Sequence, residues 1–484
     1  MDFVTDLHLH SKYSRAVSKD MTLPVMVEYA RKKGFDILST GDWTHPLWLR
    51  EIKVQLEETH EGLFQLKNKK QQEKPVYFLL SVEISSIYSQ NGKGHRIHNL
   101  VLSPGFETCE KINAELIKRG CNLSSDGRPI IGLSSRDLLE MLLQIDERVV
   151  LIPAHIWTPW FSLYGANSGF DSLEDCFGDM SPYVYGIETG LSSDPEMNWQ
   201  IKDLETRTIL SFSDAHSPAK MGREATVFRL EAASYGNVRE AIMSQSMKLD
   251  VGDWKMDKEV GNLRLEKKAL TSNFQSPHLP SNIQHLNSNR VLYTIEFYPE
   301  EGKYHYNGHR NCNIIETPDE TRKKGVMCPV CKRKLTVGVM QRVEDLANEH
   351  PRGVIQGNAQ GLQWITDPKG IHPPFVKMVP LNEIIAEGFG MQVSAGKVKT
   401  MFDTLCTAFG SEIEVLLRAS VDEIAKVSTA KIAEGIRKVR GGNIVIKPGF
   451  DGEYGIVKIW DEERKNDSFS AKASADKQLG IDFL

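Results

Sequence analysis

Short apolar runs alternate with polar and amphipathic segments along the first half of the chain. Between the first two runs, Leu23, Val27 and Ala30 recur at the spacing of one helix face. Alternating strand and helix patterns favour a parallel α/β architecture, and in closed barrels of this kind functional groups gather at the carboxyl ends of the strands. The runs lie at 4–10, 35–40, 76–82, 96–102, 149–152, 184–187 and 208–210.

The first of these runs and the segment just after the last one each carry a pair of residues of metal-binding type. His8 and His10 alternate along the first run, so both side chains lie on one face of a strand. Asp214 and His216 have the same spacing just after the last run. Alternating histidines alone are as well explained by ordinary polar positions on a half-buried strand. The recurrence of the pattern leads us to expect that the two ends close around metal.

Further histidines and carboxylates stand at or just after the intervening runs, namely Asp42, Glu83 and His155, with His98 inside its run. Taken singly, each has an ordinary explanation: a helix N-cap for Asp42, a surface carboxylate for Glu83, a satisfied core histidine for His98. Their joint recurrence favours a metal centre, and imidazole with carboxylate suits Zn, Mn or Fe. The set exceeds what one ion can use, so we expect two or three divalent metals, with Zn, Mn or Mg as candidates.

Composition narrows the class of protein. The chain has 484 residues, which favours two to four domains, and a formal net charge of -5, which gives no global basic signature for nucleic acid. Seven cysteines, an odd number, do not read as a disulfide framework and favour a reducing compartment. No basic leader precedes an apolar run and no apolar stretch has membrane-spanning length, so we expect a cytoplasmic protein without a membrane partner.

The second half carries a zinc-like motif. His309-x-x-Cys312 is followed by Cys328-Pro329-Val330-Cys331, a spacing that suits one tetrahedral structural zinc, with His305 as an alternative fourth ligand. Basic residues surround it and form the local patch that a net acidic DNA-binding protein needs, although they could equally face water. These basic residues are Arg310, Arg322, Lys323, Lys324, Lys332, Arg333, Lys334 and Arg342.

Two loops hint at the substrate. The segment after His155 contains Trp157, Trp160 and Tyr164, whose faces could stack on an unpaired base or could pack as a lid over the barrel. After the last histidine, Lys220 and Arg223 could hold a phosphate or simply be solvated.

The pattern divides the chain into five parts. We expect a barrel at 1–250, an irregular connection at 251–290, a zinc-binding module at 291–345, a mainly helical domain at 346–460 and a disordered tail at 461–484. The helical domain could grip a duplex backbone or only pack. The tail ends in a peptide similar to those that dock into sliding clamps, closest to the bacterial form, through Gln478, Leu479, Ile481 and Phe483.

The first half resembles the polymerase and histidinol phosphatase (PHP) superfamily of metal-dependent phosphoesterases. The resemblance rests on His8-x-His10, on Glu83 after an apolar run, on Pro153-Ala154-His155 and on Asp214-Ala215-His216. It implies a distorted seven-stranded (β/α) barrel that hydrolyses phosphoesters, with Asp214 or His216 also handling a proton. The implied metal ligands are His8, His10, Asp42, Glu83, His98, His155, Asp214 and His216.

The chain departs from the superfamily pattern in two places. A further histidine that often follows the first pair is replaced by Ser14-Arg15, and the usual Thr-Asp-His becomes Thr40-Gly41-Asp42 with His45 displaced. Either Asp42 or His45, or both, could therefore be a ligand. The first departure also leaves open a barrel that has lost a metal and only binds DNA.

The barrel combined with this zinc motif is similar to the endonuclease Q family. The segments that carry this resemblance are 293–305, the zinc knuckles and Gly41-Asp42-Trp43-Thr44-His45-Pro46. It implies a nucleoid-associated DNA repair endonuclease that cuts double-stranded DNA 5′ of deaminated bases (uracil, hypoxanthine, xanthine) or at abasic sites. The alternative is a PHP-family phosphatase acting on a small phosphomonoester. No phosphate loop of the GxxxxGK[ST] type is present, so ATP-driven unwinding is not expected.

Overall fold

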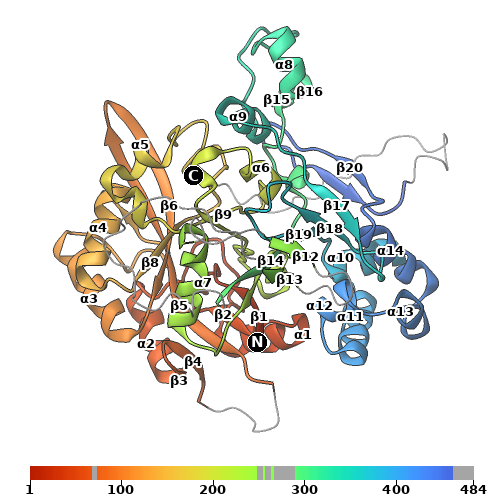
Figure 1. Ribbon diagram of the computed structural model, residues 1–484, viewed down its shortest axis with the longest axis horizontal. Coiled ribbons are helices and arrows are strands. Elements are labelled where there is room, and N and C mark those ends of the chain that lie inside the picture. Colours follow the sequence, from red (N-terminus) through yellow and green to blue (C-terminus); the bar gives the residue numbers. More distant parts are fainter. Residues whose placement is uncertain (68–73, 248–253, 257–262, 266–288, 462–484) are drawn as a thin grey trace.

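A computed structural model describes residues 1–67, 74–247, 254–256, 263–265 and 289–461. The predicted clamp peptide and most of the predicted connection at 251–290 lie outside the described residues. The described chain is a mixed α/β structure built on a large sheet (Figure 1). Among the described residues, no helix combines the length and the apolar character needed to cross a membrane.

Strands from the first half of the chain follow one another around a common centre. β1 pairs with β2 and β2 with β5, all parallel, whereas β6 is antiparallel to both β5 and β8. The separate pair of β9 and β10 is joined to its neighbours at loop positions, where Ile156 N donates to Glu188 O (3.1 Å) and His10 N to Ala215 O (3.4 Å). These strands are β1 (Asp2–Asp6), β2 (Ile37–Ser39), β5 (Tyr77–Gln90), β6 (Lys93–Ser103), β8 (Val150–Pro153), β9 (Gly186–Glu188) and β10 (Thr208–Leu210).

The long hairpin of β5 and β6 departs from the expected parallel pattern. The sequence predicts a strand that ends at Glu83, but β5 continues through Gln90 and returns as β6. Asn91 and Gly92 both have positive φ (53° and 78°), which matches the twist that a tight hairpin needs. Because β6 is antiparallel to β5, the middle of β6 passes the site, and His98 lies opposite Ser85, beside Glu83.

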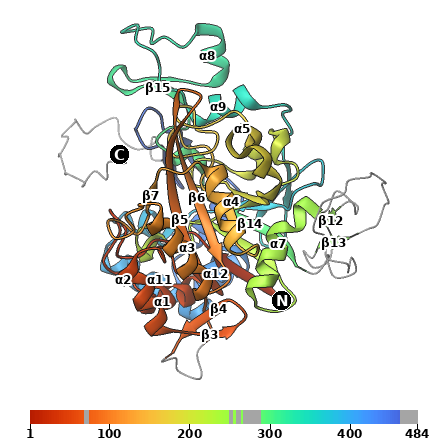
Figure 2. The same ribbon diagram turned by 90° about the vertical axis from the view of Figure 1, so that its left-hand side faces the viewer.

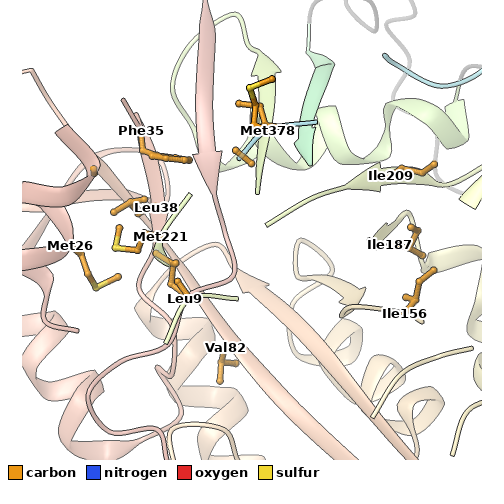
Figure 3. Packing of buried hydrophobic residues seen from close by; sticks show 14 of the residues in the cluster. Leu9, Met26, Phe35, Leu38, Val82, Ile156, Ile187, Ile209, Met221 and Met378 are labelled. Atoms are coloured by element: carbon orange, nitrogen blue, oxygen red, sulfur yellow. The ribbon is translucent and has the colours of Figure 1, made fainter. Parts of the chain in front are cut away.

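Helices cover the strands and shield a continuous apolar core. In α4, Ser134 caps the helix by accepting from Asp137 N, and Leu138, Leu139 and Leu142 face inward. Figure 3 shows Leu9 between the strands, within the same buried cluster as Met26, Leu38 and Met221. The helices of this half are α1 (Leu23–Lys33), α2 (Pro46–Gln55), α3 (Phe106–Lys118), α4 (Ser135–Ile145), α5 (Leu173–Phe177), α6 (Pro195–Asn198) and α7 (Tyr235–Met247).

The main sheet continues into the second half of the chain. β11 pairs with β1, β14 with β11 and β19 with β14, so the sheet runs across the predicted boundaries at 290 and 346. The remaining strands of this sheet are β3 (Leu56–His60), β4 (Leu63–Leu66), β7 (Ile130–Ile131), β11 (Ala225–Arg229), β14 (Arg290–Glu296), β17 (Val354–Gly357), β18 (Gln363–Thr366) and β19 (Phe375–Lys377). β12 (Trp254–Met256) and β13 (Leu263–Leu265) pair separately.

Two further units flank this body. The segment with β15 (Asn307–His309), β16 (Ile314–Glu316) and α8 (Pro318–Lys324) projects from it in both views (Figures 1 and 2). α9 (Val339–Leu346) follows. A helical unit contacts α1, where Lys33 Nζ lies 2.7 Å from Glu412 Oε2 in a buried ion pair. Its helices are α10 (Leu381–Phe389), α11 (Gly396–Phe409), α12 (Glu412–Leu417), α13 (Val421–Val427) and α14 (Ala430–Arg440), followed by β20 (Val445–Lys447) and β21 (Ile456–Lys458).

Candidate metal centre

Seven of the predicted ligand residues converge, five of them after strand ends and Glu83 and His98 from the middle of β5 and β6. They form three overlapping groups: His8 with His10 and Glu83, His10 with Asp214 and His216, and Glu83 with His98 and His155. Within each group one ligand atom per residue lies within 4.8 Å of the others. Because His10 and Glu83 each belong to two groups, the arrangement offers neighbouring positions for more than one cation.

Glu83 is the hub of the cluster. Its Oε1 lies 2.6 Å from His98 Nδ1 and 3.1 Å from His155 Nε2, and its Oε2 lies 3.6 Å from His10 Nε2. The Glu83 side chain is 1% exposed. Asp214 closes the other side, with Oδ1 2.9 Å from His10 Nε2 and 3.7 Å from His8 Nε2.

Two carboxylates behind the cluster orient its first histidines. Glu188 Oε1 lies 2.9 Å from His8 Nδ1, and Asp42 Oδ1 lies 3.2 Å from His10 Nδ1. Each imidazole therefore turns its Nε2 toward the centre, the arrangement in which a carboxylate fixes a metal-binding histidine. Glu188 also accepts from the backbone N–H of His155 at 2.9 Å. Sequence reasoning did not include Glu188 among the ligating groups, although its position at the end of the run 184–187 carried the same signal.

Asp42 and His45 have places different from those of the converging ligands. Asp42 Oδ2 accepts from Ser11 N (2.6 Å) and Ser14 Oγ (2.8 Å), so both carboxylate oxygens are engaged behind His10. His45 stacks on Tyr13 with ring centroids 4.5 Å apart. Neither residue belongs to the ligand groups found among the described residues.

Burial and close charges shift the protonation of the cluster. Burial alone would lower the pKa of His8, but Glu188, Asp214 and Glu83 outweigh it and raise that pKa to about 10. For His216 burial dominates and lowers the pKa to about 4. Burial alone would raise the pKa of Asp214, yet the facing histidines hold it well below its usual range. Positive charge is therefore strongly favoured here, and a divalent cation would take the place of the protons.

Strained backbone marks the same positions. Asp42, His155 and Asp214 all have positive φ, at 52°, 29° and 46°. Residues other than glycine rarely adopt this conformation, and such residues concentrate at functional sites. At Gly190, a Cβ atom would lie 2.3 Å from His155 Cβ, so only glycine leaves room for that histidine.

The residues present fit divalent metals. His8 Nε2 and Glu83 Oε2 are buried and have no hydrogen-bond partner among the described residues, which is costly unless a further ligand completes them. Mixed imidazole and carboxylate donors are those of Zn and related transition metals. Divalent cations held here would lower the pKa of water and neutralise charge on a phosphoryl group.

Of the three aromatic residues predicted to contact a base, two are buried in the core and one is exposed at the surface. Trp157 and Tyr164 are 1% and 0% exposed, and Trp157 Nε1 donates to Asn198 Oδ1 at 2.8 Å, so both side chains serve packing. Trp160 is 39% exposed and lines a pocket of about 360 Å³ together with His95 and Arg96. Only Trp160 of the three therefore offers a face to a base.

Phe161 lies between a residue of this pocket and the candidate metal centre. Its ring centroid is 5.5 Å from Arg96 Cζ and 4.8 Å from the ring centroid of His98, and its φ is 61°, an unusual value for a bulky residue. Sequence reasoning passed over Phe161 because nothing in the run of aromatic residues distinguishes it.

The two predicted phosphate-binding cations already have partners. Lys220 Nζ lies 3.0 Å from Glu383 Oε1 of α10, and Arg223 Nε donates to Ser213 O at 3.3 Å. Lys220 therefore ties the loop after Asp214 to the helical unit, and Arg223 supports the backbone just before Asp214.

The zinc-like motif also converges. His309, Cys312, Cys328 and Cys331 each offer one ligand atom within 4.8 Å of the others, whereas His305 is buried outside this group. Burial alone would raise the pKa of Cys328, but the backbone N–H groups of Cys331 and Val330 lower it to about 7. A thiolate is the form that binds zinc, so the knuckle favours a metal.

Comparisons with known proteins show a family model and two relatives to which this chain is similar. Residues 380–443 match the family model of the MJ0043 C-terminal domain. MJ0043 of Methanocaldococcus jannaschii, an uncharacterized protein, is 30% identical over 328 residues, 67% of this chain but 33% of that protein, so the chain spans about a third of it. The uncharacterized protein YqxK of Bacillus subtilis is 26% identical over 469 residues, which cover 94% of this chain and 98% of YqxK.

Two solved structures share the fold over nearly the whole chain. The lesion-specific endonuclease PfuEndoQ of Pyrococcus furiosus has a TM-score of 0.73 and 28% identity, covering 96% of this chain and 97% of its own. Endonuclease Q in complex with a 27-mer duplex that carries an abasic lesion at the active site has a TM-score of 0.73 and 29% identity, covering 96% and 98%. The predicted resemblance to endonuclease Q is therefore confirmed, and it extends over almost the entire chain.

Proposed function

We propose that this protein is a metal-dependent DNA repair endonuclease that hydrolyses the phosphodiester 5′ of a deaminated base or at an abasic site in double-stranded DNA. The observation that carries the proposal is the set of three overlapping ligand groups, within a chain whose fold matches lesion-specific endonucleases throughout. Uracil, hypoxanthine and xanthine are the proposed deaminated bases.

The proposed metal ligands are His8, His10, Glu83, His98, His155, Asp214 and His216, with Asp42 and Glu188 orienting His10 and His8. Asp214 and His216 are the residues proposed to move the proton of the attacking water. They are the most accessible members of the cluster, with side chains 22% and 20% exposed. Substrate reaching the cluster would therefore meet them first.

The wider organisation supports a long substrate. We propose a seven-stranded barrel within 1–250, a zinc-binding module in the projecting part of 291–345 and a helical domain in the part of 346–460 that follows β19, because β14 and β17 to β19 belong to the main sheet. Lys323, Arg333 and Lys334 of the module are exposed and have no acidic partner among the described residues. Such residues suit contacts with phosphates of a duplex that extends beyond the metal centre. Binding of residues 478–484 to a sliding clamp stays a prediction, because they lie outside the described chain.

Cleavage of labelled duplexes tests the proposal. Each duplex carries one uracil, hypoxanthine or abasic site, and Mn²⁺, Mg²⁺ or Zn²⁺ is added to wild type and to Asp214→Asn. We expect wild type to nick on the 5′ side of the lesion and the variant to lose at least about 10²-fold in rate, the usual effect of removing one preorganised electrostatic contact. Turnover of a small phosphomonoester without any nicking would instead assign the barrel to a phosphatase.

A further inference from the structure

An arginine that none of the motifs includes reaches the metal centre. Arg128 Nη1 lies 3.8 Å from Glu83 Oε2, and its side chain is only 16% exposed. A guanidinium stays protonated in proteins, so Arg128 is a permanent positive charge beside the carboxylate of Glu83.

The guanidinium of Arg128 uses few of its N–H donors within the described chain. Its hydrogen bond within the described chain runs from Nη2 to the backbone oxygen of Arg15 at a long 3.4 Å, and the 3.8 Å approach to Glu83 is beyond hydrogen-bond distance. A guanidinium carries five N–H donors, so Arg128 has donors left for a ligand. Its Nη1 lies on the side of Glu83, where a planar fork suits two oxygens of a phosphate.

The loop that carries Arg128 is fixed to the segments that carry the ligands. Gly127 N donates to Tyr13 O (3.2 Å), and Ser85 N donates to Pro129 O (2.9 Å). At Gly127 a Cβ atom would lie 2.5 Å from Asp42 Oδ2, so the loop can approach this closely only with glycine there. Arg128 is thus held in place by the backbone on both sides before any substrate arrives, the preorganisation that electrostatic catalysis requires.

We propose that Arg128 is a catalytic residue that binds a non-bridging oxygen of the scissile phosphate, an inference that rests on the proposed phosphodiesterase function. In the reaction the water oxygen bonds to phosphorus, the bond between phosphorus and one bridging ester oxygen breaks, and that oxygen leaves with a proton. Arg128 keeps its own protons and stabilises the added negative charge of the transition state.

Arg15 provides the matched control. Arg15 follows the ligands His8 and His10 in the chain. Its Nε lies 3.5 Å from Asp126 Oδ2, but its side chain is 73% exposed. Arg128→Gln and Arg15→Gln therefore remove the same charge, one inside the cluster and one outside it. Arg128→Lys keeps the charge and loses the planar fork.

The test combines inorganic phosphate binding by calorimetry, metal content and lesion-duplex nicking, all on the metal-loaded full chain. We expect Arg128→Gln to keep its metal, to bind phosphate at least about 10-fold more weakly and to lose about 10²-fold in kcat with little change in KM. Arg128→Lys should recover part of the loss, and Arg15→Gln should bind phosphate like wild type.

Two results would overturn the inference. One is unchanged phosphate binding in Arg128→Gln. The other is a loss of metal in parallel with activity, which would make Arg128 a residue that only positions the ligands. If wild type fails to nick any lesion but its phosphate binding still depends on Arg128, the proposed substrate is wrong while the assignment of Arg128 to a phosphate holds.

Discussion

The two ligand clusters of this protein are built in opposite ways. The centre around Glu83 draws its ligands from residues 8 to 216 and buries His8 and His10 completely, with carboxylates fixing both imidazoles from behind. The cluster of His309, Cys312, Cys328 and Cys331 spans a short segment that projects from the body (Figure 2). Cys331 is exposed.

This difference predicts that folding around the first cluster does not need metal, whereas folding around the second does. The strands around Glu83 have a large apolar core of their own, so they should hold their ligands in place without a cation. The projecting segment buries few side chains, and small segments of that kind commonly depend on their zinc to fold. Metal should therefore be needed for chemistry in the first cluster and for local structure in the second.

Removing a zinc ligand should have the largest effect on structure. Structural zinc in small modules binds with an apparent free energy of about 10–16 kcal/mol, so Cys328→Ser should unfold the segment around it. We expect rapid proteolysis between 310 and 335 and the loss of one equivalent of zinc, while the thermal unfolding of the main α/β body is unchanged. Cys121→Ser is the control, since Cys121 lies outside both clusters.

The proposed difference between the two clusters is wrong if removing metal with a chelator has the same effect on the folding around both. Stripping all metal from wild type should abolish nicking and expose the segment to protease, yet leave the main α/β body folded. Unfolding of this body together with the segment would show that both clusters depend on metal for structure.

A smaller effect should follow from removing an orienting carboxylate. Glu188→Gln keeps the shape but replaces the charge that holds His8 Nδ1 at 2.9 Å. Loss of such a partner typically lowers metal affinity or activity by about 10–100-fold. Titration of the stripped wild type and variant with Mn²⁺ measures this, and rebinding of zinc by the cysteine cluster is the internal reference. An unchanged Mn²⁺ affinity would show that His8 is held by the strand alone.

The smallest effect concerns the pH dependence of the free energy of unfolding. Burial and the nearby Asp194 raise the pKa of Glu296 to about 8, so the folded state holds a proton that the unfolded chain releases near pH 4.5. A group with a raised folded pKa contributes stability that is lost as pH rises, here by at most about 1.4 kcal/mol per pH unit up to pH 8. Urea unfolding at pH 5 to 9, followed by fluorescence of the buried Trp43 and Trp48, measures the slope.

Glu296→Gln should flatten that slope, because a neutral amide has no proton to release. Glu224, whose pKa burial and Glu296 raise well above its usual range, should keep part of the dependence. Glu107→Gln is the control, since this exposed glutamate of α3 has a side chain that is 83% exposed. An equal slope in all three proteins would locate the pH dependence elsewhere.

Much of the site was predictable because its signals are local. The alternate spacing of His8 and His10 indicated a shared site, although β1 ends at Asp6 and both histidines follow the strand that was predicted to carry them. The repeated position after apolar runs indicated Glu83, His155 and Asp214. The knuckle spacing likewise identified the cysteine cluster without any tertiary information.

The sequence left open the direction of individual strands and the burial of individual side chains. The pattern could not show that β6 runs antiparallel to β5, which is why His98 looked misplaced inside its strand although it faces Glu83. Aromatic density in the loop after His155 did not separate the buried Trp157 from the exposed Trp160.

The sequence by itself determined the ligand types and their spacing, since these follow from strand periodicity and from tight turns within a few residues. Only the tertiary structure decided which groups meet: Asp42 behind His10, Glu188 behind His8, and Arg128 beside Glu83. Those contacts join segments far apart in the chain, and packing and charge in the folded state, rather than any local pattern, bring them together.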